Sequence, residues 1–187
     1  MTVADEVIQL MKQRGGAAYF GEPVSQLEHA LQTAWRATQA GNPPELTLAA
    51  LLHDIGHLLH DLPESAADDG VDTLHEIAGY DWILTRFGPR VAAPVRLHVA
   101  AKRYLSCVDS EYLARLSPAS IQSLALQGGP YSEEEARAFE ALPYYREAVM
   151  LRRWDDEAKI PGIVAPAIEE YRKMLSAGIG PAPYSAR

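Results

Sequence analysis

The spacing of apolar residues constrains the fold of this 187-residue chain more than any other feature of its sequence. Apolar side chains recur at intervals of three and four residues along almost the whole chain, and strand-like alternation is absent. Glycine and proline clusters divide the pattern into segments about as long as an average helix, which has about 11 residues. The sequence therefore predicts a single all-α bundle of roughly eight to ten helices.

Helix-start and helix-stop signals give the bounds of these helices. Two capping boxes are among the signals, one at residues 25–28 and one at residues 132–135. Residues 60–72 are polar and acidic, so we expect a loop there, and we expect residues 178–187 to form a mobile tail. The predicted helices cover residues 3–13, 25–41, 45–59, 74–86, 90–105, 109–116, 118–127, 143–158 and 166–177, with another beginning at residue 132.

Charge and composition exclude several classes of protein. A net charge of −8 does not provide the basic surface that nucleic-acid binding needs. No apolar run approaches the length of about 20 residues that spans a membrane, and the N-terminal residues lack a signal-peptide pattern. The single cysteine, Cys107, excludes an internal disulfide and fits a reducing compartment. We therefore expect a cytoplasmic protein that binds neither nucleic acid nor membrane.

The adjacent residues His53 and Asp54 follow an apolar run in the segment LAALLHDIGHLLH, residues 48–60. A helix with so much apolar surface buries most of its side chains, and buried ionisable groups need partners. A metal ion is a partner that uses both side chains, and imidazole nitrogen with carboxylate oxygen suits iron, manganese and zinc. The pair therefore predicts a metal site.

Three further histidines and one aspartate extend this pair into an ordered series. His29, His75 and His98 lie on different predicted helices, and Asp155 follows in the segment LRRWDDEAK. A catalytic metal with an open position usually keeps about three protein ligands. Four imidazoles and two carboxylates therefore suit two metal ions that share Asp54 as a bridge.

The whole series, from about residue 19 to residue 155, resembles the HD-domain superfamily, an all-α metal-binding fold. Within it, the extended set resembles the mixed-valent diiron oxygenases, which include the myo-inositol oxygenases and the enzymes that cleave 1-hydroxyphosphonates. The likeness is closest to the type that acts on 2-amino-1-hydroxyethylphosphonate or on its N-trimethyl analogue. The resemblance implies a single HD domain over residues 1–187, with its core at about residues 19–176.

The resemblance also implies two iron ions in the Fe(II)/Fe(III) state. The implied ligands are His29, His53, Asp54 and Asp155 for one iron, and Asp54, His75 and His98 for the other. Asp156 is the alternative to Asp155. We prefer Asp155 because Arg152 precedes it by three residues on the same helix face, as the resemblance expects.

Tyr19 and Glu22 resemble the two lid residues of these oxygenases. The tyrosine would occupy an iron position until the substrate displaces it, and the glutamate would recognise the substrate's amino group. His57, three residues after Asp54, would contact the substrate or act as a base, with a structural role as the alternative. The remaining histidine, His60, has no such role and is expected at the surface.

The expected phosphonate site combines a cation with hydroxyl groups. Lys102 lies four residues after His98 and therefore points the same way along the helix. Ser120 and Ser123 lie near a helix start, where hydroxyls and backbone N–H groups favour anions. The segment also resembles the phosphonate-binding segment of the dioxygenases, and Arg152 is expected either to complete the charge around the phosphonate or to pair with an acid.

The implied activity is oxidative cleavage of a carbon–phosphorus bond by O₂. A 1-hydroxy-2-(amino or trimethylamino)ethylphosphonate would give phosphate plus glycine or glycine betaine, and the sequence leaves the methylation of the amine open. The implied partners are this small organophosphonate and O₂, with no protein partner. An HD-type metal-dependent phosphohydrolase acting on nucleotides or phosphate esters is the alternative, and a non-catalytic ligand-binding HD module is a third possibility.

Overall fold

The computed structural model describes residues 1–19, 21–59 and 73–177, and within these ranges the fold is all-α as predicted. Ala18 and Ser25 form an isolated antiparallel β-bridge. The predicted 60–72 loop, His60 and the 178–187 tail lie outside the described residues. The helices are α1 (Val3–Arg14), α2 (Gln26–Gln39), α3 (Pro44–Leu52), η1 (Ile55–Leu58), α4 (His75–Phe87), α5 (Pro89–Val108), α6 (Tyr112–Arg115), α7 (Pro118–Leu126), α8 (Glu133–Glu140), α9 (Tyr145–Glu157), η3 (Ile168–Tyr171) and α10 (Arg172–Ser176).

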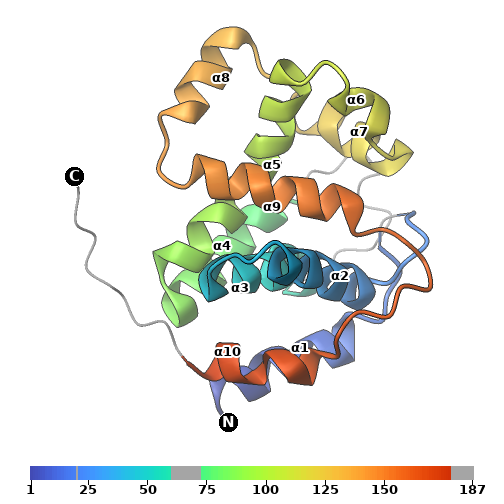
Figure 1. The fold of residues 1–187 in the computed structure, drawn as a ribbon, viewed down its shortest axis with the longest axis vertical. Coiled ribbons are helices and arrows are strands. Elements are labelled where there is room, and N and C mark those ends of the chain that lie inside the picture. The colour runs from blue at the N-terminus through green and yellow to red at the C-terminus, as the bar shows by residue number, and fades with distance from the viewer. Residues whose placement is uncertain (20, 60–72, 178–187) are drawn as a thin grey trace.

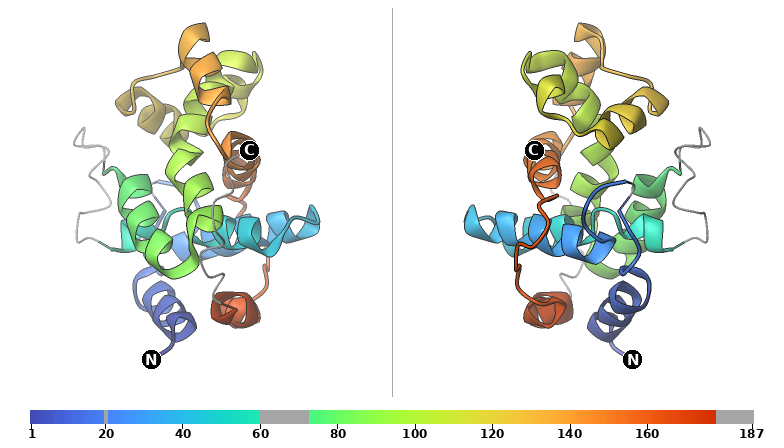
Figure 2. Two further views of the ribbon diagram at one scale, coloured as in Figure 1. Left: turned by 90° about the vertical axis from the view of Figure 1, so that its left-hand side faces the viewer. Right: turned by 90° about the vertical axis from the view of Figure 1, so that its right-hand side faces the viewer.

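Helix α5 links the two ends of the molecule. Figures 1 and 2 place α1 and α10 at one end and α6, α7 and α8 at the other. Between them, α5 packs against α3, α4 and α9, and α2 packs against α3 and α9. These helices surround the interior in which the candidate site lies.

Helix α3 is at the centre of the main core because every residue from 46 to 52 is buried. A helix that is apolar on all sides must be covered on all sides, and here α2, α5 and α9 pack around it. The core around α3 also includes Ile83 and Phe87 of α4 and Leu175 of α10. The C-terminal end of α3 therefore delivers the next residues, His53 and Asp54, into the interior.

The predicted helix over residues 45–59 is wrong in its second half. The α-helix ends at Leu52, His53 is its C-cap, and Asp54 begins the short 3-10 helix η1. Asp54 has φ −102° and ψ 12°, outside the α-helical range, so the chain turns between the two residues. In η1, the backbone at Gly56 lies so close to the carbonyl group of His75 that a side chain at this position would collide with it.

Two further expected bounds also differ from the structure. Asp109 was expected to cap the next helix, but α6 begins at Tyr112 and its N-cap is Glu111. Asp109 instead accepts a hydrogen bond from the backbone N–H of Glu111. The expected last helix is divided into η3 and α10. The two predicted capping boxes, by contrast, are both present.

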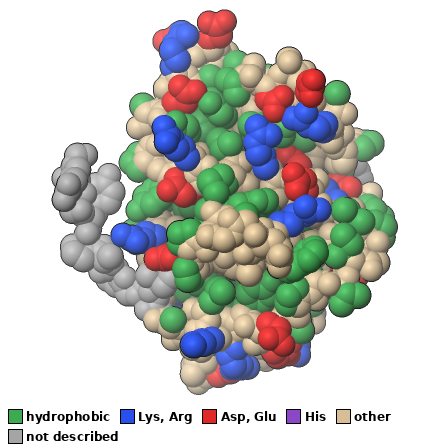
Figure 3. Space-filling model, in the orientation of Figure 1, with side chains coloured by type: hydrophobic (Ala, Val, Ile, Leu, Met, Phe, Trp, Pro, Cys, Tyr) green, Lys and Arg blue, Asp and Glu red, His purple; other side chains and the backbone are tan. Residues whose placement is uncertain are grey.

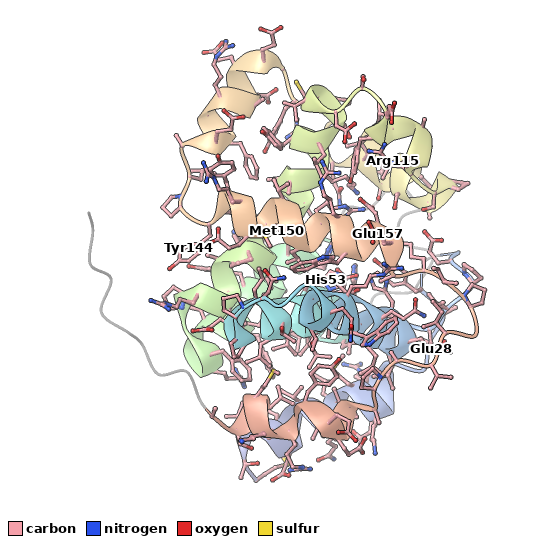
Figure 4. The ribbon with its side chains drawn as sticks, in the orientation of Figure 1. Glu28, His53, Arg115, Tyr144, Met150 and Glu157 are labelled. Atoms are coloured by element: carbon pink, nitrogen blue, oxygen red, sulfur yellow. The ribbon has the colours of Figure 1, made fainter. Side chains whose placement is uncertain are left out.

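None of the helices in the described part of the chain combines the length and apolar character needed to cross a bilayer. Acidic and basic side chains are interspersed over the face shown in Figure 3, where no described histidine is visible. The described histidines are thus largely an interior feature, as Figure 4 illustrates for His53 between α3 and α9.

Replacing Gly56 with alanine should destabilise the protein, because the added Cβ would lie 2.0 Å from the carbonyl oxygen of His75. Relief of that overlap must separate η1 from α4, at a cost of about 1–3 kcal/mol. Chemical denaturation of both proteins measures the difference in the free energy of unfolding. Gly16→Ala is the matched control, because a Cβ there meets no atom within 4 Å. Equal stability of the two variants would contradict the close approach at Gly56.

Candidate metal centre

Six side chains from five helical segments converge in the interior. His29 comes from α2, His53 and Asp54 from the turn after α3, His75 from the start of α4, His98 from α5 and Asp155 from α9. Their exposed fractions range from 0% to 8%. The structure therefore brings together all six residues that the sequence analysis selected as metal ligands.

Asp54 lies between two pairs of imidazoles. Its Oδ2 is 3.2 Å from Nε2 of His53 and 3.7 Å from Nε2 of His29. Its Oδ1 is 3.3 Å from Nε2 of His75 and 3.5 Å from Nε2 of His98. The two oxygens of one carboxylate thus face different pairs, and the residues form two possible metal sites that share Asp54.

Backbone carbonyls determine which ring nitrogen carries the hydrogen in His29, His53 and His98. The Nδ1 atom of His29 lies 2.9 Å from the carbonyl oxygen of Ala158, that of His53 lies 2.9 Å from the carbonyl oxygen of Ala50, and that of His98 lies 2.7 Å from the carbonyl oxygen of Val95. A carbonyl oxygen only accepts, so each Nδ1 donates and each neutral ring presents a lone pair at Nε2. This second hydrogen bond is the one that metal-binding histidines usually make.

The paired lone pairs need a positive charge between them. Nε2 of His29 lies 3.1 Å from Nε2 of His53, and the Nε2 atoms of His75 and His98 are also 3.1 Å apart. Burial alone would lower the pKa of His53, but the neighbouring carboxylate of Asp54 raises it to about 9. The cluster therefore favours positive charge at the point where the nitrogens and carboxylates meet, and either a proton or a metal ion would provide it.

Asp155, rather than Asp156, faces the imidazoles. Oδ1 of Asp155 is 3.3 Å from Nε2 of His29 and is buried without a hydrogen-bond partner. Its other oxygen, Oδ2, accepts from Arg152 at 2.8 Å. Burial would raise the pKa of Asp155, but the charge of Arg152 outweighs it and holds the pKa well below its usual range. Asp155 thus offers an ionised, unshared oxygen, which is what a metal ligand requires.

The guanidinium of Arg152 is engaged by the chain itself. Besides Asp155, it donates to both carboxylate oxygens of Asp156, and its Nε is 3.1 Å from the hydroxyl of Tyr112. Arg152 is 5% exposed, so these contacts hold it within the interior. Its geometry is that of a residue that positions Asp155, and its expected contact with phosphonate stays a prediction.

Tyr19 reaches the centre from the loop before α2. Its hydroxyl donates to Oδ2 of Asp54 at 2.7 Å, and its ring stacks on His29 with centroids 4.0 Å apart. A turn that bonds Glu22 N–H to the Tyr19 carbonyl, with Gly21 at φ 76°, shapes this loop. Burial, together with the charge of Asp54, raises the pKa of the Tyr19 hydroxyl well above its usual value, so it remains a donor.

His57 lies beside the centre although the expected shared helix face with Asp54 is absent. Its ring stacks on His75 with centroids 3.9 Å apart and planes inclined by 20°. This contact fits either of the two predicted roles, contact with the substrate or support of a ligand.

Two lysines meet two serines of α7 next to the centre. Lys102 is 2% exposed and donates to Ser123 Oγ at 2.7 Å, while Lys159 donates to Ser120 Oγ at 2.8 Å. Burial, assisted by the nearby charge of Arg152, lowers the pKa of Lys102 to about 7. A bound anion would restore its charged form. This corner of the interior therefore suits an anionic group.

Lys159 and Ser117 also contact the predicted lid residue Glu22. Its carboxylate oxygen Oε1 lies 3.3 Å from Lys159 Nζ and accepts from Ser117 Oγ at 2.5 Å. The sequence analysis did not select Lys159. The available signal was its position four residues after Asp155, the same spacing that selected Lys102 after His98.

Comparison with known proteins gives one family and several relatives. Residues 27–141 match the HD domain. The chain is 43% identical over 162 residues, 86% of this chain and 81% of the relative, to the hydroxymethylphosphonate dioxygenase of Gimesia maris. It is 42% identical over 167 residues, 89% of this chain and 85% of the relative, to the [1-hydroxy-2-(trimethylamino)ethyl]phosphonate dioxygenase (glycine-betaine-forming) of Leisingera caerulea. An uncharacterised protein of Acanthamoeba polyphaga mimivirus is 34% identical over 171 residues, which are 90% of this chain and 78% of that protein.

Asp155→Asn should lower the metal content of the purified protein, because the substitution removes the charge of an unshared ligand oxygen. Metal per chain is measured by inductively coupled plasma mass spectrometry after dialysis. Asp156→Asn is the matched control on the same helix turn, and we expect it to keep the wild-type content because Asp156 is directed to Arg152 and Tyr112. An equal loss in both variants, or a loss only in Asp156→Asn, would reverse the assignment.

Proposed function

The chain belongs to the HD-domain family, and on that premise we propose that it is an iron-dependent enzyme that uses O₂ to cleave the carbon–phosphorus bond of a 1-hydroxyphosphonate. The observation that carries the proposal is the position of Asp54 between two imidazole pairs. Chain-wide identity to two proteins named as phosphonate dioxygenases supports it. We also propose that the chain forms one HD domain with a core at about residues 19–176.

The donor set is consistent with two iron ions. Imidazole nitrogens with carboxylate oxygens are ligands that suit iron, and Asp54 belongs to both possible sites, so it would be shared by two ions. We propose His29, His53, Asp54 and Asp155 for one ion, and Asp54, His75 and His98 for the other. When bound, the irons would supply the redox chemistry that lets O₂ oxidise carbon C1 of the substrate.

Lys102 and the two serines of α7 are proposed to bind the phosphonate. Lys102 is buried and donates to the Ser123 hydroxyl, and no ion pair with a described carboxylate engages it, so a bound anion would balance its charge. Ser120 and Ser123 present hydroxyls beside the two lysines. Charged hydrogen bonds of this kind orient the substrate so that C1 and its hydroxyl point toward the metal centre.

Tyr19, Glu22 and His57 are proposed to act around the reacting carbon. Substrate entry would break the hydrogen bond from Tyr19 to Asp54, and the loop that carries Tyr19 and Glu22 would close over the site and exclude water. His57, stacked on His75, is proposed to contact the 1-hydroxyl of the substrate and accept its proton.

The overall reaction balances without any further reactant. A 1-hydroxyphosphonate and O₂ give one carboxylic acid and one phosphate, since one oxygen atom is added at C1 and one becomes part of the phosphate. The product from an aminated substrate would be glycine, and from its trimethylated analogue glycine betaine.

Phosphate release should therefore depend on O₂. Iron-loaded protein is incubated with hydroxymethylphosphonate, 2-amino-1-hydroxyethylphosphonate, the trimethylated analogue and a nucleoside monophosphate, each in air and under argon. We expect phosphate to appear in proportion to the O₂ consumed from at least one phosphonate, and none to appear under argon. Phosphate released from the nucleotide under argon would instead assign the chain to the HD phosphohydrolases.

Lys102→Met should raise the KM for the phosphonate by about tenfold or more, because a charged hydrogen bond contributes about 1.5–3 kcal/mol. Steady-state kinetics of phosphate release measures KM and kcat separately. Lys173→Met, which removes an exposed lysine of α10, is the control and should leave both unchanged. Unchanged kinetics in Lys102→Met would remove this lysine from the binding site.

A further inference from the structure

The charge of the lid carboxylate is already balanced within the chain. Glu22 Oε1 lies 3.3 Å from Nζ of Lys159, and the side chains are 9% and 10% exposed. Ser117 donates to the same oxygen and holds it toward α7. A buried pair of this kind is weakly screened by solvent, so removal of one partner would expose the full charge of the other.

Lys159 also lies close to the aromatic ring that borders the site. Its Nζ is 5.7 Å from the ring centroid of Tyr19, within the range of a cation–π contact. The same Tyr19 ring is stacked on His29. A carboxylate and an aromatic face are the two groups that would attract an ammonium or a quaternary ammonium, and Lys159 is next to both.

The other cations near the site do not share this arrangement. Arg152 is paired with Asp155 and Asp156 and is thereby neutralised. Lys102 donates to Ser123, and no described carboxylate forms an ion pair with it. Lys102 is therefore free to pair with an anion, whereas Glu22, the carboxylate expected to face a cationic substrate group, is already paired with Lys159.

We propose that Lys159 is a specificity-determining residue that takes the place of a substrate ammonium, so that this chain prefers 1-hydroxyphosphonates without a cationic group, such as hydroxymethylphosphonate. The inference rests on the proposed function and names the substrate class of the same site. A positively charged nitrogen attached to C2 would approach Lys159 Nζ and meet like charge. Such repulsion is a common means of rejecting a competing ligand.

The test compares kcat/KM for hydroxymethylphosphonate, 2-amino-1-hydroxyethylphosphonate and its trimethylated analogue, measured as O₂-dependent phosphate release from iron-loaded protein. The wild-type protein should prefer hydroxymethylphosphonate. Lys159→Met should shift the ratio toward the cationic substrates by about tenfold or more, which corresponds to loss of one charged contact. Lys159→Arg, which keeps the charge, and Lys173→Met, at the surface, should keep the wild-type ratio.

Several results would overturn the inference. One is a preference of the wild-type protein for a cationic substrate. That result is measured without the variant, so it would overturn the inference even if Lys159→Met did not fold. Another is an unchanged ratio of kcat/KM between the cationic substrates and hydroxymethylphosphonate in folded Lys159→Met. A third is an equal rise of KM for all three substrates in this variant, which would show that Lys159 binds the phosphonate instead. Absence of O₂-dependent phosphate release from all three substrates would refute the proposed function itself, which distinguishes the two failures.

Discussion

Two pairs of imidazole nitrogens meet at the carboxylate of Asp54, and within each pair the Nε2 atoms lie 3.1 Å apart in the interior. Backbone carbonyls accept the Nδ1 hydrogens of His29, His53 and His98, so positive charge, from a proton or a metal ion, is favoured at the Nε2 side of these rings. The surrounding fold maintains this arrangement. Helix α3 is buried on all sides, and the turn after it places His53 and Asp54 among ligands from α2, α4, α5 and α9.

The charges around this centre fall into three groups, and each has a different consequence. Arg152 balances Asp155 and Asp156 and keeps one unshared oxygen of Asp155 directed at His29. Lys102 is buried with a hydroxyl partner and therefore favours an anion. Lys159 is paired with Glu22 and makes the lid side of the site close to neutral. The site thus has one side suited to metal, one suited to a phosphonate and one with no net charge.

Much of the fold could be predicted from the sequence because helical spacing and capping boxes are local signals. The proposed ligand set is a series spread over residues 29–155, and it was selected from these residue types together with their resemblance to a known family. The helix bounds after Leu52 could not be predicted, because the contact of Gly56 with the backbone of His75 joins two segments that are distant in sequence. Arg152 was expected either to bind the phosphonate or to pair with an acid, and the choice of Asp156 and Tyr112 as partners depends on side-chain conformation. The pairing of Lys159 with Glu22 joins residues 137 positions apart in sequence, which no periodicity reveals.

The central claim is that six side chains hold two metal ions bridged by Asp54. Anomalous diffraction from crystals of iron-loaded protein, recorded on both sides of the iron absorption edge, tests it most directly. Two iron peaks per chain are expected, one among His29, His53, Asp54 and Asp155, and one among Asp54, His75 and His98. A single peak, or iron bound elsewhere with the imidazole pairs unligated, would contradict it.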